Sequence, residues 1–169
     1  MKTICASVAL AFGLIVFGQA AAADTCTPVK GYLELCGLEA DWREAPDRTA
    51  DGWPTFRHES GLTGLARAVG TPGGAAPTDE EIQAIIGNES IIERRQALTI
   101  LFEETRLAGQ PARLIVKEAG GYVRAYTFAT CGTAVIMIST IEYPTTLFHN
   151  SHRRAHEALA GATTVRNCK

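Results

Sequence analysis

The sequence predicts a small α+β domain with a mainly antiparallel sheet flanked by helices. The first observation is the stretch Leu107–Tyr143, which has the pattern of a three-strand meander. Its apolar-rich runs, Arg113–Lys117, Tyr122–Phe128 and Ala134–Ile141, are separated by Gly-Gly and Cys-Gly turns. The second is a pair of segments with helix-capping patterns outside this stretch, and the third is an even number of cysteines after the predicted leader.

The first 23 residues are predicted to be a cleaved signal peptide. Lys2 supplies a positive start, Ile4–Phe17 an apolar core, and Ala21–Ala23 the small residues that signal peptidase needs before Asp24. No later stretch reaches ~18 continuous apolar residues, so no transmembrane segment is expected in the mature chain. We therefore expect residues 24–169 to form a single domain, located in the periplasm or secreted.

The charge balance argues against nucleic acid as the partner of this chain. The net charge is −2, and removal of Lys2 with the signal peptide makes it −3. A nucleic-acid-binding domain needs an excess of basic residues to neutralise phosphates. The sequence also has no polybasic amphipathic helix of the kind that binds membrane surfaces.

Four cysteines remain after the signal peptide with Cys5 is removed, and they predict two disulfides in an exported chain. Three connectivities are possible, of which we favour Cys26–Cys36 as a local link and Cys131–Cys168 as a link from the sheet to the C-terminus. The alternative of a cysteine metal site lacks the usual C-x2-C spacing.

In the first half of the chain, Tyr32–Leu35 is predicted to be a short strand. Arg43–Gly52 is polar and contains proline, so we expect a turn there. Trp53–Ser60 and Leu62–Val69 have the pattern of a hairpin, and the small residues of Gly64–Ala66 leave room for another element to pack closely.

Beyond the loop Thr71–Pro77, a capping box at Thr78–Glu81 starts a predicted helix that ends at Gly87, and Ser90–Glu93 repeats the pattern. Ala97–Leu107 fits helical spacing and alternation alike. We favour a strand there because a turn and an obvious strand follow it.

After the meander, Pro144 ends the last strand, and Asn150 or Ser151 is expected to cap a C-terminal helix that runs to about Ala162. Phe148, Ala155 and Leu159 are expected to face the sheet.

Taken together, the order of these elements resembles the PsbP-like superfamily, which includes PsbP, the Ran-binding Mog proteins and the DcrB-like periplasmic proteins. The matching pieces are Trp42, Phe56-Arg57-His58, Leu107–Ala112, Tyr126-Thr127-Phe128 and Ala134–Ile138. The resemblance implies an α/β/α sandwich around an antiparallel sheet, with roles in binding or assembly rather than catalysis. It assigns no functional residues, and the four cysteines depart from the usual members.

His149, His152 and His156 form the sharpest candidate for chemistry, because on a helix they share one stripe beside Glu157 and could bind a divalent metal. The stripe lacks the second histidine of the H-E-x-x-H motif, which excludes the zinc-protease mechanism. The simpler interpretation is an amphipathic helix with histidines on its polar edge. We assign no metal site and keep these residues as candidates only.

Other catalytic patterns are weak. Ser60 follows His58-Glu59 and does not lie in a G-x-S-x-G elbow, and Glu80-Glu81 and Glu103-Glu104 are neighbours whose side chains diverge. No phosphate-binding loop is present, so we expect no cofactor.

The sequence therefore predicts an exported accessory protein without catalytic residues, which binds another envelope or secreted protein. The alternatives are a carrier of a small ligand or metal and, with less support, a hydrolase.

Overall fold

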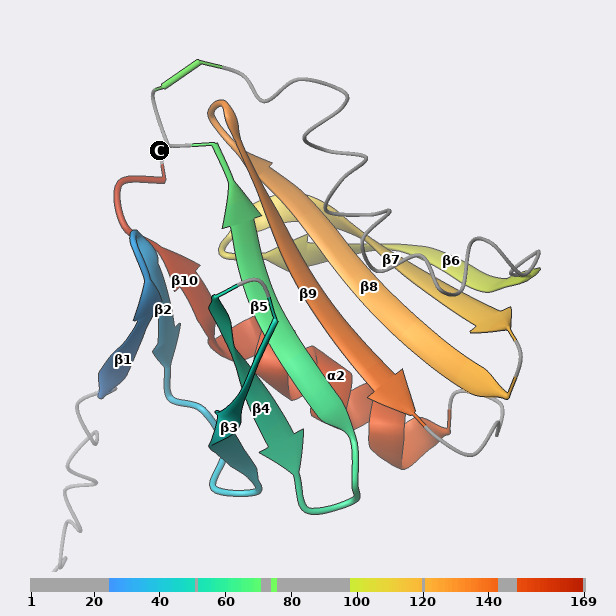
Figure 1. The fold of residues 1–169 in the computed structure, drawn as a ribbon. Coiled ribbons are helices and arrows are strands. Elements are labelled where there is room, and N and C mark those ends of the chain that lie inside the picture. The colour runs from blue at the N-terminus through green and yellow to red at the C-terminus, as the bar shows by residue number, and fades with distance from the viewer. Residues whose placement is uncertain are drawn as a thin grey trace, which may run out of the picture.

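The computed structural model describes residues 25–50, 52–70, 74–75, 98–119, 121–142 and 149–168. Most of these residues lie in strands of two antiparallel sheets, and the described part contains one helix, α2 (Asn150–Ala162), on one side of the larger sheet (Figure 1). The expected α/β/α sandwich is therefore wrong, because the described chain is mostly β and has a helix on one face of the sheet only. The antiparallel character of the sheet is as predicted.

The larger sheet has seven strands, and every neighbouring pair is antiparallel. From one edge to the other its strands are β3 (Trp42–Ala50), β4 (Trp53–His58), β5 (Thr63–Val69), β9 (Ala134–Glu142), β8 (Tyr122–Cys131), β7 (Gln110–Ala119) and β6 (Leu98–Leu107).

A second sheet of three strands, β1 (Cys26–Lys30), β2 (Leu33–Cys36) and β10 (Thr163–Val165), packs beside the first. The strand β10 follows α2 directly and pairs with β2, so the C-terminal segment lies against the N-terminal hairpin (Figure 1). Two disulfides are present: Cys26–Cys36 joins β1 to β2, and Cys131–Cys168 joins the end of β8 to the C-terminus.

The predicted meander and the predicted hairpin of Trp53–Ser60 and Leu62–Val69 are confirmed. Strands β7, β8 and β9 pair in sequence, β4 pairs with β5, and the ambiguous stretch 98–107 is strand β6. The expected turn at Arg43–Gly52 is wrong, since Trp42–Ala50 forms β3. An edge strand pairs on one side only, and it tolerates charged residues and Pro46 where a central strand would not. Strand β1 lies at an edge of the three-stranded sheet, and its sequence has no pattern that predicts a strand.

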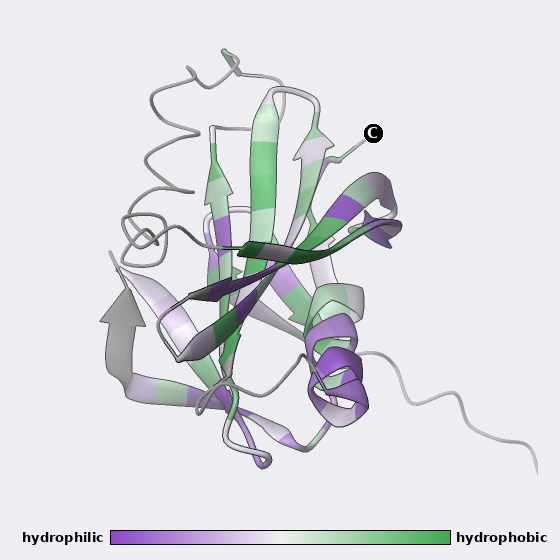
Figure 2. Ribbon diagram, turned by 90° about the vertical axis from the view of Figure 1, so that its right-hand side faces the viewer, coloured by the Kyte–Doolittle hydropathy of each residue, from purple (hydrophilic) through white to green (hydrophobic). Residues whose placement is uncertain are grey.

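The helix α2 packs on the sheet through Ala155, His156 and Leu159, while its outer surface is largely hydrophilic (Figure 2). Its N-cap is His149, one or two residues before the expected Asn150 or Ser151. Gly64 on β5 makes the close approach possible, because a Cβ there would lie 2.6 Å from Leu159 and 2.8 Å from Trp42. The Trp42 indole Nε1 then donates to the Ala155 carbonyl at 3.0 Å.

Several predictions fall outside the described residues: the signal peptide, the helix from Thr78 to Gly87, the capping pattern at Ser90–Glu93 and the placement of Phe148. Among the residues that are described, no helix is long and apolar enough to cross a membrane.

Candidate functional site

The three candidate histidines all lie at or in α2, but they occupy different environments. His149 is exposed at the N-cap, His152 is half-buried, and His156 is fully buried against the sheet. The rings of His149 and His152 lie 6.1 Å apart, centre to centre. The shared stripe expected from the spacing is therefore divided between the surface and the core.

His156 is held between two strands of the sheet. Its Nε2 lies 2.7 Å from Oγ1 of Thr127 on β8, and its Nδ1 lies 2.8 Å from Oγ1 of Thr140 on β9. Burial lowers its pKa to about 3, because the charged imidazolium cannot be solvated there. Both ring nitrogens are thus bonded to threonines, and His156 would have to leave this position to share a metal with His149 and His152.

The same local contact occurs twice at the surface, and it explains the proximity of His58 to Ser60. At the β4–β5 turn the Ser60 backbone N–H donates to Nδ1 of His58 at 3.2 Å, and the Ser60 hydroxyl lies 2.7 Å from that nitrogen. At the start of α2, Ser151 makes equivalent contacts with His149. In both places a histidine two residues before a serine stabilises a chain reversal or a helix start.

A serine nucleophile at Ser60 would need its histidine oriented by an acid. Within the described part of the chain, no carboxylate is hydrogen-bonded to His58, whose ring instead lies 5.0 Å from the Trp42 ring. The contact between His58 and Ser60 is therefore explained by the β4–β5 turn alone.

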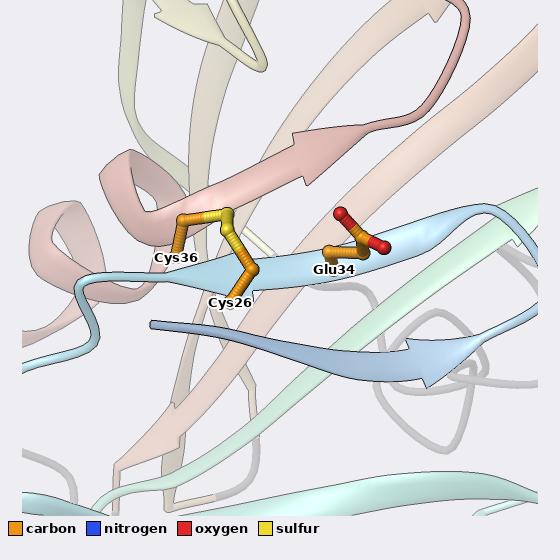
Figure 3. A group of neighbouring side chains, drawn as sticks. All are labelled: Cys26, Glu34 and Cys36. Atoms are coloured by element: carbon orange, nitrogen blue, oxygen red, sulfur yellow. A yellow bond between two sulfur atoms is a disulfide. The ribbon is translucent and has the colours of Figure 1, made fainter. Parts of the chain in front are cut away.

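The described residues contain one group of three potential metal ligands, Cys26, Glu34 and Cys36. Figure 3 shows the two sulfurs bonded to each other, with the Glu34 carboxylate beside them. Glu34 also pairs with Arg166 at 3.0 Å. A thiol in a disulfide supplies no thiolate to a metal, so this group is a structural link between β1 and β2.

The adjacent carboxylates of β6 diverge as expected. Glu103 points to the α2 side, where it pairs with Arg153 at 2.5 Å, and Arg153 also bonds Glu157 at 2.8 Å. These two bonds raise the pKa of Arg153. Glu104 lies on the other side of the sheet, opposite Arg113 of β7.

We name the side of the seven-stranded sheet opposite α2 the far face. The pairing register collects basic residues there, although the chain as a whole is acidic. These residues are Arg43, Arg57, Arg67, Arg106, Arg113, Lys117 and Arg124. Glu44, Glu103 and Glu118 lie on the α2 side. The two sides of the sheet therefore differ in charge, which the linear sequence does not reveal.

A groove of about 610 Å³ lies on the far face beside β6. Its lining includes Glu104 of β6, Arg113 and Ile115 of β7, Phe128 and Thr130 of β8, and Val135 of β9. The Arg113 guanidinium carbon lies 5.9 Å from the centre of the Phe102 ring, and the Phe128 ring stacks on Tyr126 at 5.8 Å. The groove combines an apolar floor with one basic and one acidic residue at its edge.

Next to the groove, β6 exposes apolar side chains at the edge of the sheet. Leu98 is 66% exposed, Ile100 39% and Phe102 57%. In contrast, Trp42, Phe56 and Tyr126 are buried, and half-buried Trp53 is covered by Lys30, so these aromatic residues serve packing. The sequence does not reveal the groove or the exposure of β6, because the apolar pattern of this stretch does not show that the strand lies at the edge of the sheet.

Comparisons with families of known proteins and with curated protein sequences find no match. Among solved structures, the chain is similar to the cyanobacterial PsbP (CyanoP) of Synechocystis sp. PCC 6803, with 13% identity and a TM-score of 0.50 over 88% of this chain and 96% of that one. A protein of Bacteroides thetaiotaomicron matches with 12% identity and a TM-score of 0.49, over 80% of this chain and 46% of that one. The similarity to the CyanoP structure shows that the chain has a PsbP-like fold.

Proposed function

We propose that the mature chain is an exported, non-catalytic accessory protein that binds another envelope or secreted protein. The PsbP-like fold supports this role, because the resemblance to that superfamily implies binding or assembly. Two disulfides fit an oxidising compartment, which agrees with the signal peptide expected at residues 1–23.

The observation that carries the proposal is the exposed apolar edge strand β6. An edge strand presents unpaired backbone N–H and C=O groups, and soluble proteins usually protect it with charge, proline or irregular pairing. The opposite edge, β3, has Pro46 and a shift of register between Ala45 and Thr49. Strand β6 has a register shift between Thr99 and Leu101, yet it exposes Leu98, Ile100 and Phe102.

This combination is suited to β-strand addition, in which an extended segment of a partner pairs with a sheet edge. The partner's backbone would pair with β6, and its apolar side chains would cover Leu98, Ile100 and Phe102. Edge pairing needs no catalytic group on either chain.

The test is capture of a partner from an extract of exported proteins, with the disulfide-bonded mature chain as bait. We expect one stoichiometric partner with the wild type, and loss of that partner with Phe102→Lys, which places a charge on the exposed edge. Tyr122→Lys is the matched control, because Tyr122 is also an exposed apolar residue (42%) but lies on β8, inside the sheet. Equal capture by all three baits, or no capture by any, would contradict the proposal.

A further inference from the structure

We propose that the groove on the far face binds the C-terminal residue of a partner polypeptide. The terminal carboxylate pairs with Arg113, the last main-chain N–H donates to Glu104, and an apolar last side chain packs on Ile115, Phe128 and Val135. This inference rests on the proposed function, since the groove adjoins the exposed strand β6, and it adds the chemistry of the segment that binds.

The position of Arg113 allows it to bind a carboxylate. It is exposed, it lines the groove, and its guanidinium lies over the Phe102 ring at 5.9 Å. The guanidinium is a planar group that binds a carboxylate through two parallel hydrogen bonds, and contact with an aromatic ring leaves these donors available. Glu104 is directly opposite in the register, but among the described residues the two form no ion pair.

Glu104 determines which kind of carboxylate fits. A simple apolar acid brings one negative charge toward Arg113 and offers nothing to Glu104, so the two carboxylates would repel each other. The end of a polypeptide carries an N–H donor two bonds from its terminal carbonyl carbon, and it can therefore satisfy both residues. Glu104 and Arg113 are directly opposite each other in the register and both line the groove, so one chain end can reach both side chains. A segment from the middle of a chain has no carboxylate for Arg113.

The apolar floor sets the preference for the last side chain. Ile115, Phe128 and Val135 are half-buried and come from three adjacent strands, so their positions are fixed by the sheet. Stacking on Tyr126 also holds the Phe128 ring. A volume of about 610 Å³ is within the usual range of ligand pockets and holds an aromatic or large aliphatic residue with part of the residue before it.

The probe is a short peptide with an N-terminal fluorescein and the sequence Gly-Ser-Leu-Phe, titrated with the disulfide-bonded mature protein and followed by fluorescence anisotropy. We expect saturable binding of the free acid, and binding of the C-terminal amide that is weaker by about 10- to 100-fold, because a charge-assisted pair is lost. Unlabelled 3-phenylpropionate, an apolar acid without an N–H, is expected not to displace the peptide at equal concentration.

The variants separate the groove from general attraction to a basic surface. Arg113→Gln should weaken binding of the free acid about tenfold or more while leaving the amide unchanged. Thr130→Trp should reduce both by filling the groove from an exposed position. Arg57→Gln is the matched control, because Arg57 is an exposed arginine of the far face on the distant strand β4; it should bind like the wild type.

Equal affinity for acid and amide, an equal loss with Arg57→Gln and Arg113→Gln, or displacement by 3-phenylpropionate would each overturn the inference. The results distinguish failure of the groove proposal from failure of the proposed function. If partner capture depends on Phe102 but no peptide binds, the edge is used and the groove is not. If neither capture nor peptide binding occurs, both proposals are wrong.

Discussion

At the scale of single residues, the buried side chain of His156 links the stability of the fold to pH. It is fully buried, it bonds Thr127 and Thr140, and it stays neutral because burial lowers its pKa to about 3. In the unfolded chain the same imidazole has its ordinary pKa of about 6.5. As the pH falls below that value, the unfolded state takes up a proton that the folded state does not, so stability decreases with falling pH.

We therefore expect His156 to make the free energy of unfolding pH-dependent between about pH 6.5 and 3. Its contribution should fall by about 1.4 kcal/mol for each pH unit within this window. Urea unfolding of the wild type and of His156→Gln at pH 7, 6 and 5 measures this, and the variant, although less stable at pH 7, should show the smaller slope. Parallel curves for the wild type and His156→Gln would contradict the assignment.

Gly64 determines how closely α2 approaches the sheet. Gly64→Ala should destabilise the protein by about 1–3 kcal/mol, because the new methyl group would overlap Leu159 and Trp42. Gly161→Ala is a natural control. It lies in α2, and apart from its chain neighbours and its own helix backbone no described atom lies within 4 Å of the added Cβ, so the change should stabilise the protein by about 0.5–1 kcal/mol through helix propensity. Thermal melts of the two variants should therefore shift in opposite directions.

At the scale of elements, the two disulfides fasten different parts of the fold. Cys26–Cys36 closes a separation of 10 residues within one hairpin, whereas Cys131–Cys168 closes 37 residues and holds the segment after β10 on the end of β8. A longer closed loop removes more entropy from the unfolded chain.

Replacing Cys131 and Cys168 together by alanine should cost more stability than replacing Cys26 and Cys36, by about 1 kcal/mol on the chain-entropy model. Cys131 is also buried, which adds a small cavity to its loss, whereas Cys26 is exposed. Chemical denaturation of both double variants under oxidising conditions compares them. A larger loss for the Cys26 and Cys36 pair would show that the local hairpin controls stability.

The elements also show where sequence patterns succeed. The meander β7–β8–β9 and the hairpin β4–β5 were predictable, because glycine-containing turns separate apolar strands that pair with their neighbours in the chain. Strand β3 was mistaken for a turn, since Pro46 and its charged neighbours are allowed only by its position at an edge. Edge position follows from the order of strands, which no local pattern contains.

At the scale of the whole molecule, the candidate site could not be predicted, because it depends on pairing between distant strands. The histidine spacing in α2 is visible in the sequence, but the threonines that bind His156 lie 29 and 16 residues earlier. Likewise, the groove brings Glu104, Arg113, Phe128 and Val135 together from four strands. Only the register places Arg113 beside Glu104 and separates the basic far face from the acidic side.

The proposed export, together with the two disulfides, predicts a defined mass for the mature molecule. Intact-mass measurement of the exported protein should give residues 24–169, lighter by two hydrogens for each of the two disulfides. After denaturation without a reductant, no thiol should react with an alkylating reagent. A product that retains residues 1–23, or four alkylated cysteines, would contradict the proposed export into an oxidising compartment.

The position of the two disulfides has a further consequence for how the chain can be divided. Residues 25–70 contain β1–β5 and the Cys26–Cys36 bond, and residues 98–168 contain β6–β10, α2 and the Cys131–Cys168 bond. Neither bond crosses between these parts, which meet through non-covalent contacts: β5 with β9, β2 with β10, and Trp42 with Ala155. Two separately cross-linked fragments, produced as independent polypeptides, should therefore reassemble by complementation into the native sheet.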